Sequence, residues 1–151
     1  MQPDLQLPSG LIAGSRHSFP VRVYFEDTDL SGIAYHANYL KWCERARSDL
    51  LRLLGIDQRA AHEAGEGYYA VSEAQIKWRR PARFEDVLRV ETEALDVRAA
   101  SARLLQKVFR GEDLLAEIEI VAAFLAADGR PKRQPESWRA AFANFTRKDP
   151  E

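Results

Sequence analysis

Length, composition and charge indicate one globular domain and exclude several kinds of partner. The chain has 151 residues, of which 46% are hydrophobic, and this is enough for a single buried core. Its 22 basic residues nearly cancel its 23 acidic residues, so no overall field favours nucleic acid or an anionic membrane surface. The single cysteine, Cys43, excludes an intrachain disulfide and favours a reducing, cytoplasmic location.

The N-terminal residues resemble neither a signal peptide nor a membrane span. Residues 1–16 mix Pro, Gly and Ser with isolated Leu, a pattern typical of a flexible arm. They lack a basic segment followed by a continuous apolar run, and no stretch of the chain approaches the ~20 apolar residues of a transmembrane segment. We therefore expect an arm at 1–16, one folded domain at 17–146 and a C-terminal tail at 147–151.

A strand and a long helix are predicted after the arm. Apolar residues alternate with polar ones from Phe19 to Phe25, as in a half-buried strand. Residues 27–37 are too polar and too rich in turn formers to continue it. From Asn38, a residue type favoured as an N-cap, apolar residues recur at helical spacing up to Gly55. This pattern predicts a helix of about 16 residues, near 25 Å long.

The rest of the chain shows a two-residue period and predicts four further strands, at about residues 70–78, 88–94, 103–109 and 114–124, before a short helix at 136–145. No crossover helices separate these strands. The order therefore predicts an α+β fold, with an antiparallel sheet of about five strands around one long central helix. One sheet around one helix leaves an edge or a face uncovered, which favours a homodimer or homotetramer.

Asp29 is the strongest candidate for chemistry. It lies in the loop that feeds the helix, two residues after Asp27 and three before Gly32. Backbone N–H groups at a helix start can polarise a carbonyl oxygen, while a neighbouring carboxylate attacks the carbonyl or activates water. This arrangement suits acyl transfer. The competing interpretation is that Asp27 and Asp29 only accept hydrogen bonds from turn or cap N–H groups.

The histidines and the cysteine allow several interpretations. His36, just before the helix, could orient a substrate, assist proton transfer, contribute its backbone N–H, or be an ordinary hydrogen-bonded loop histidine. His17 and His62 have no partners at ligand spacing and are expected at the surface. No metal is expected, since the carboxylates at 26, 27 and 29 alone do not complete a shell. Cys43 lies on the apolar face of the helix and is interpreted as a core residue.

Two basic groups are predicted at strand ends. The first surrounds Pro81 and contains Arg79, Arg80 and Arg83 with Lys77; the second follows the last strand and contains Lys132 and Arg133 with Arg130. Either group could bind phosphates, and either could be a solvated rim.

Several of these segments together resemble the signature of YbgC-like acyl-CoA thioesterases, relatives of 4-hydroxybenzoyl-CoA thioesterase. The matching segments are Arg22-Val23-Tyr24-Phe25-Glu26-Asp27-Thr28-Asp29, Gly32, Tyr35-His36-x-Asn38-Tyr39 and Glu44-Arg45-Ala46-Arg47. Two later segments are also similar to the family's: Lys77-Trp78-Arg79-Arg80-Pro81-Ala82-Arg83 and Asp128-Gly129-Arg130-Pro131. The resemblance extends from about Phe19 to Arg133.

The resemblance implies the hotdog fold, with sites between subunits, and hydrolysis of acyl-CoA to a carboxylic acid and free CoA without metal or redox cofactor. Asp29 matches the family's catalytic aspartate, a nucleophile or general base, and His36 matches a residue whose backbone N–H polarises the thioester carbonyl. Further residues are predicted to bind the substrate: Gly32, Tyr35 and Asn38, together with Arg79, Arg80, Arg83, Lys132 and Arg133. The basic residues at the strand ends would hold the CoA phosphates.

One departure and two alternatives remain. Phe25 stands where relatives often carry a second tyrosine, which leaves the acyl preference open. A hotdog dehydratase acting on acyl thioesters is one alternative, because His17-Ser18-Phe19-Pro20 is similar to the His-Phe-Pro of that group, although the following Gly is missing. A non-catalytic module that only binds acyl-CoA is the other. The sequence also leaves open whether the carrier is CoA or acyl carrier protein.

Overall fold

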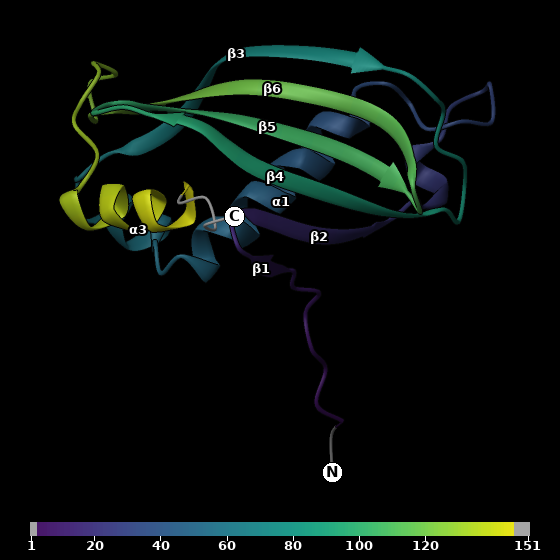
Figure 1. Cartoon of the computed structure of the whole chain (residues 1–151), viewed down its shortest axis with the longest axis horizontal. Helices are drawn as coiled ribbons and strands as arrows, with labels where there is room; N and C mark the ends of the chain where they lie inside the picture. Colours follow the sequence, from purple (N-terminus) through teal and green to yellow (C-terminus); the bar gives the residue numbers. More distant parts are fainter. Residues whose placement is uncertain (1–2, 147–151) are drawn as a thin grey trace.

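The computed structural model describes residues 3–146, in which one long helix lies under a curved antiparallel sheet (Figure 1). The described strands are β1 (Leu11–Ala13), β2 (Arg16–Arg22), β3 (Tyr68–Trp78), β4 (Val87–Val97), β5 (Ser101–Arg110) and β6 (Asp113–Leu125). The described helices are the 3-10 turn η1 (Phe25–Asp27), α1 (Asn38–Leu53), α2 (Gln58–Glu63) and α3 (Glu136–Thr146). The expected tail at 147–151 lies outside the described residues.

The strands form one sheet in the order β1-β2-β4-β5-β6-β3, with every neighbouring pair antiparallel. The predicted α+β hotdog arrangement is confirmed. The sheet has six strands in the described residues rather than about five, because a short β1 is added beside β2. The two edges are β1 and β3, and β3 is the long one. An eleven-residue edge strand presents a row of backbone groups that can pair with another chain.

The sequence of α1 explains why the sheet encloses it. Its buried apolar residues recur mainly on one face of the helix, and all except Leu51 have another three or four positions away: Tyr39, Trp42, Cys43, Ala46, Leu50 and Leu51. The first four of them share one core with buried residues of the sheet, among them Leu88, Val108 and Ile118. Full burial of one such large apolar side chain contributes about 1.5–3 kcal/mol. Gly55, at φ +80°, ends the helix in a conformation that suits glycine.

The N-terminal segment differs from the expected flexible arm. β1 pairs with β2 from Leu11 opposite Ser18 to Ala13 opposite Arg16. Before β1, the Ser9 hydroxyl and the Gly10 N–H each donate a hydrogen bond to Asp49 on α1, both at 2.9 Å. The segment from position 9 onward is therefore part of the fold.

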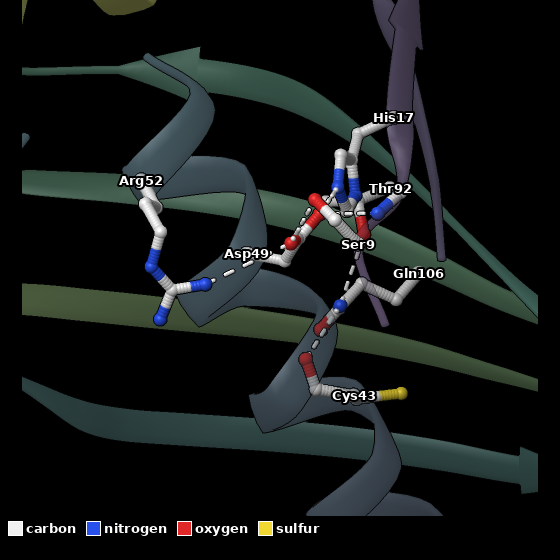
Figure 2. A network of polar contacts seen from close by, with 8 residues as sticks. Ser9, His17, Cys43, Asp49, Arg52, Thr92 and Gln106 are labelled. Carbon is white, nitrogen blue, oxygen red and sulfur yellow. Dashed lines mark hydrogen bonds and ion pairs between the residues drawn. The ribbon is translucent and has the colours of Figure 1, made fainter. Parts of the chain in front are cut away.

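His17 was predicted at the surface, and this prediction is wrong. Its ring is fully buried, with Nε2 2.7 Å from Oδ2 of Asp49, which is itself only 2% exposed (Figure 2). Burial raises the pKa of Asp49, but hydrogen bonds from His17, Gly10 and Ser9 outweigh it and hold the pKa below its usual value. Because an ionised carboxylate only accepts hydrogen bonds, we infer that the proton sits on Nε2 of His17. Its Nδ1 has no partner within residues 3–146.

Gly10→Ala is expected to release this N-terminal segment. A Cβ at position 10 would lie 2.0 Å from the Ser18 carbonyl oxygen and 3.0 Å from Oδ2 of Asp49, so backbone would have to move. We expect a loss of about 1–3 kcal/mol in the free energy of unfolding, measured with urea, and faster proteolysis near the N-terminus. Leu11→Ala is the control, because that side chain is exposed. Equal stabilities of the two variants would contradict the prediction.

Candidate active site

The loop between β2 and α1 folds back on itself and carries Asp29 at its turn. Thr28 pairs with Ala34, and the Asp29 N–H donates to the Ile33 carbonyl at 3.1 Å. The turn closes through Gly32, whose N–H donates to the Asp29 carbonyl at 3.0 Å and whose φ of +82° suits glycine. The loop thus brings Asp29 back toward the start of the helix.

The Asp29 carboxylate is exposed to solvent in the single chain, and its two oxygens differ. Oδ1 accepts hydrogen bonds from the Ser31 hydroxyl and, at 2.8 Å, from the Ser31 N–H. Oδ2 accepts none from the described residues. The Ser31 hydroxyl and N–H are the main causes that lower the pKa of Asp29, and His36 adds a smaller electrostatic effect. Asp29 is therefore an exposed carboxylate with a lowered pKa, and one of its oxygens accepts no hydrogen bond from the described residues.

Asp27 fits the competing interpretation as a turn residue. Its side chain accepts a hydrogen bond from the Tyr24 N–H at 2.8 Å. Its carbonyl oxygen accepts from the Tyr35 N–H at 2.8 Å and from the Asn38 side chain at 2.7 Å. Asn38 is therefore not the N-cap that the sequence predicted. That position belongs to Ala37, and Asn38 instead ties the first turn of α1 to the loop.

The start of α1 presents unpaired backbone donors. Among the residues that the structure describes, the N–H groups of His36 and Ala37 have no acceptor, whereas the Asn38 N–H donates to the Tyr35 carbonyl at 3.0 Å. The carbonyl of His36 is held by the indole Nε1 of Trp78, 3.2 Å away at the end of β3. Unpaired N–H groups at a helix start stabilise an atom with partial negative charge that lies next to them.

Aromatic side chains surround this helix start. The ring of Tyr35 lies 4.4 Å from that of His36, centroid to centroid, and Trp78 meets His36 edge-on at 5.7 Å. Trp78 and Ser31 were not predicted as site residues. A serine two positions after an aspartate is a recognisable turn signal, but nothing local to Trp78 indicates its contact with a residue 42 positions away.

Phe25, where relatives often have tyrosine, lies in η1 rather than on a strand. β2 ends at Arg22, so the strand predicted as far as residue 25 is too long. Phe25 is 76% exposed, and its ring meets that of Phe84 edge-on with 6.1 Å between the ring centroids. Its neighbour Tyr24 is also exposed.

The first basic group lies beside the loop, at the end of β3. Arg83 pairs through its backbone with Ile33. Nε of Arg79 donates to Glu117 at 3.0 Å, and Arg80 lies 3.5 Å from Asp113. These two guanidinium groups are thus partly neutralised by neighbouring carboxylates on β6.

The second basic group lies at the opposite end of the sheet. The Lys132 N–H donates to the Phe124 carbonyl, and Nζ of Lys132 donates to the Glu66 carbonyl at 2.6 Å. Phe124 pairs with Tyr69, at the start of β3, whereas the loop lies beyond its end. One chain therefore does not bring Lys132 and Arg133 to Asp29.

The structure of residues 3–146 also places Cys43 and the other possible metal ligands. Burial raises the pKa of the Cys43 thiol to about 12, so it is protonated at neutral pH. No group of three or more His, Cys, Asp or Glu side chains there is arranged to hold a metal ion. In the same residues, no helix has the length and apolar character to cross a membrane.

A curved antiparallel sheet enclosing one helix defines a hotdog-fold protein, and comparison with known proteins narrows this class. Residues 23–144 match the Thioesterase-like superfamily. The acyl-CoA thioesterase YbgC of Haemophilus influenzae is 37% identical over 126 residues, which cover 83% of this chain and 93% of that protein. The acyl-CoA thioester hydrolase YbgC of Escherichia coli O157:H7 is 35% identical over 126 residues, covering 82% and 93%.

A solved structure supports the same family. A probable thioesterase from Bartonella henselae is 32% identical with a TM-score of 0.76, covering 80% of this chain and 99% of that one. The chain belongs to the Thioesterase-like superfamily.

Proposed function

We propose that this protein hydrolyses acyl-CoA thioesters to a carboxylic acid and free CoA. The observation that carries the proposal is the free Oδ2 of Asp29 in the loop beside a helix start whose His36 and Ala37 N–H groups are unpaired in the described structure. Membership of the superfamily and the printed activity of the YbgC relatives support the same reaction. The chain is thus an enzyme of the acyl-CoA thioesterase class.

The arrangement suggests a division of roles. The thioester carbonyl oxygen accepts hydrogen bonds from the N–H groups at the helix start, which stabilise the negative charge that develops there. Asp29 either attacks the carbonyl carbon, giving an anhydride that water then opens, or takes a proton from the water that attacks. In both routes the C–S bond breaks, the CoA sulfur gains a proton from water and the acid is released.

The test is release of free thiol from acyl-CoA, followed with a thiol reagent. Cys43 gives no background in the folded enzyme, because it is buried with a pKa of about 12. Tight binding of acyl-CoA without thiol release would favour the non-catalytic alternative. The dehydratase alternative gains nothing from His17, because that ring is buried against Asp49.

A homodimer formed through the β3 edges, alone or within a homotetramer, would complete the site. Two β3 strands paired antiparallel place the start of one strand opposite the end of the other. Lys132 and Arg133 of one subunit, near the start of its β3, would then approach the loop of the partner. Light scattering is expected to give at least twice the 17.2 kDa of one chain. An active monomer at micromolar concentration would contradict this assembly.

Neutralising the basic groups is expected to raise KM for acyl-CoA more than for a short thioester without the nucleotide. Phosphate contacts are remote from the carbonyl and bind ground and transition states about equally, so kcat should change little. We expect a KM increase of roughly two- to ten-fold at low salt. The increase should become smaller as salt is added, because exposed charges are screened within about 8–10 Å at physiological ionic strength.

Two double variants separate the basic groups: Arg79→Gln with Arg80→Gln, and Lys132→Gln with Arg133→Gln. Arg16→Gln, on β2 near the other edge of the sheet, is the control for loss of an ion-paired basic residue away from the proposed phosphate sites, because Arg16 pairs with Glu93. Equal effects of a double variant on both thioesters would reject phosphate binding by that group and leave it as a solvated rim.

A further inference from the structure

A cavity of about 280 Å³ lies between α1 and the inner face of the sheet, apart from the loop that carries Asp29. Tyr69 and Val71 line it from the start of β3, and Leu104 lines it from β5. Phe142 lines it from α3. The walls are mostly apolar, and the volume is near the lower end of the ~300–1,000 Å³ of ligand pockets. It suits one ring or a short chain better than a long one.

Two charged side chains of α1, Glu44 and Arg47, also line this cavity, and Arg47 is much the more buried of the two. The side chain of Arg47 is only 13% exposed, and its Nη1 donates to Oε1 of Gln106 at 2.8 Å. Nε and Nη2 donate to no acceptor within residues 3–146. The nearest carboxylate, on Glu44, is 3.9 Å away and belongs to a side chain that is 74% exposed.

The guanidinium of Arg47 is mostly buried and has N–H donors without hydrogen-bond acceptors in the part of the chain that the structure describes, so a ligand oxygen in the cavity would be a favourable partner. Arginine has five N–H donors and stays charged, so burying most of the guanidinium carries a desolvation cost. The unpaired Nε and Nη2 are not among the fully buried atoms, so a ligand or solvent can reach them. Burial lowers the pKa of Arg47, which indicates the same cost of desolvation. An oxygen atom of a ligand in the cavity would offset it.

The proposed dimer connects this cavity to the chemistry. Tyr69 and Val71 lie at the start of β3, and Trp78, which holds His36, lies at its end. Antiparallel pairing of two β3 edges therefore turns the cavity of one subunit toward the helix start of the other. Within one chain the two places are well separated, because Arg47 follows Asn38 by nine helical positions, ~13 Å along the axis.

We propose that the cavity receives the acyl group and that Arg47 selects acyl groups carrying a hydroxyl, keto or carboxylate oxygen remote from the thioester. This inference rests on the thioesterase function proposed above. It adds a class of substrate: oxygenated acyl groups of modest size. A hydrogen bond from a charged donor changes binding by roughly ten- to a hundred-fold, so the preference should be measurable.

The first test compares pairs of acyl-CoA thioesters of four, six and eight carbons, each plain or carrying a terminal hydroxyl. The wild type is expected to favour the hydroxylated member of at least one pair about ten-fold or more in kcat/KM. Arg47→Met should abolish the preference, whereas Arg45→Met, which removes a charge from an exposed position on the same helix, should retain it. A preference unchanged in Arg47→Met overturns the proposal.

A binding experiment keeps this inference separate from the thioesterase function. Affinities of the same pairs are measured by calorimetry with the Asp29→Asn variant, alone and combined with Arg47→Met. If the wild type releases no thiol from any substrate, the thioesterase function fails, yet the affinities still decide the role of Arg47. Equal affinity for plain and hydroxylated pairs, or no binding of either, overturns it.

A second variant addresses the cavity in case Arg47→Met does not fold. Ala122 of β6 lines the cavity, so Ala122→Leu would fill part of it and reduce its volume. We expect hydrolysis of the six- and eight-carbon thioesters to fall at least ten-fold, with acetyl-CoA little affected. An equal loss for all chain lengths, or none, would show that the acyl group does not enter the cavity.

Discussion

Asp29→Asn is expected to lower the hydrolysis of acyl-CoA by about 10²–10⁴-fold while the fold is kept. The amide is nearly isosteric, and its oxygen can still accept the hydrogen bonds from Ser31. It can neither take a proton from water nor attack the thioester carbonyl. The measurement is kcat from thiol release, with thermal unfolding to confirm that the variant is folded.

Asp27→Asn is the matched control, because its side chain only accepts a bond from the Tyr24 N–H. It should retain most of the activity. A folded Asp29→Asn enzyme with near wild-type kcat would exclude Asp29 from the chemistry, and Glu44, a carboxylate on α1, would become the next candidate.

The pH dependence of the wild type follows from the same carboxylate. Hydrogen bonds from Ser31 hold the pKa of Asp29 below its usual 3.8. Asp29 is therefore almost fully ionised, and so active, at pH values well above 3.8. The ionised fraction falls as the pH drops through the lowered pKa. We expect the acid limb of kcat/KM to lie below about pH 4 wherever the protein remains folded.

Asp49→Ala is expected to give the largest loss of stability, about 3 kcal/mol in the free energy of unfolding measured with urea, because several buried or half-buried donors lose their acceptor. Asp49 accepts hydrogen bonds from Ser9, Gly10 and His17, and its removal leaves a buried imidazole without a partner. Arg52→Ala removes only a 3.8 Å ion pair from a side chain that is 74% exposed, and should cost less than about 1 kcal/mol. Similar losses in both variants would contradict this role of Asp49.

The difference in the free energy of unfolding between the wild type and Asp49→Ala should become smaller at acidic pH. The pKa of Asp49 is lowered in the folded state, so its carboxylate stabilises the fold fully above the unfolded value near 3.9. That contribution is lost as the pH falls through the folded pKa. Urea unfolding at several pH values below 5 measures the change.

The sequence predicts α1 and the long strands well because their periodicity is strong and Gly55 marks the helix end. It predicts much less where structure depends on distant partners. β1 has three residues, too few for a period, and the burial of His17 depends on a carboxylate 32 positions away. Strand spacing likewise gave no sign that Lys132 lies at the far end of the sheet from Asp29.

The side chain of Gln106 fixes the position of α1 against the sheet. This fully buried residue of β5 donates from Nε2 to the Cys43 carbonyl at 2.9 Å and to the Thr92 hydroxyl at 3.0 Å (Figure 2). Apolar contacts are non-directional and tolerate small slides of a helix along a sheet, but these hydrogen bonds do not. A shift of one turn would displace α1 by 5.4 Å and break them. The hydrogen bonds of Gln106 in the middle of the sheet thus fix how far α1 lies along its axis, and with it the position of the backbone N–H groups at the start of α1.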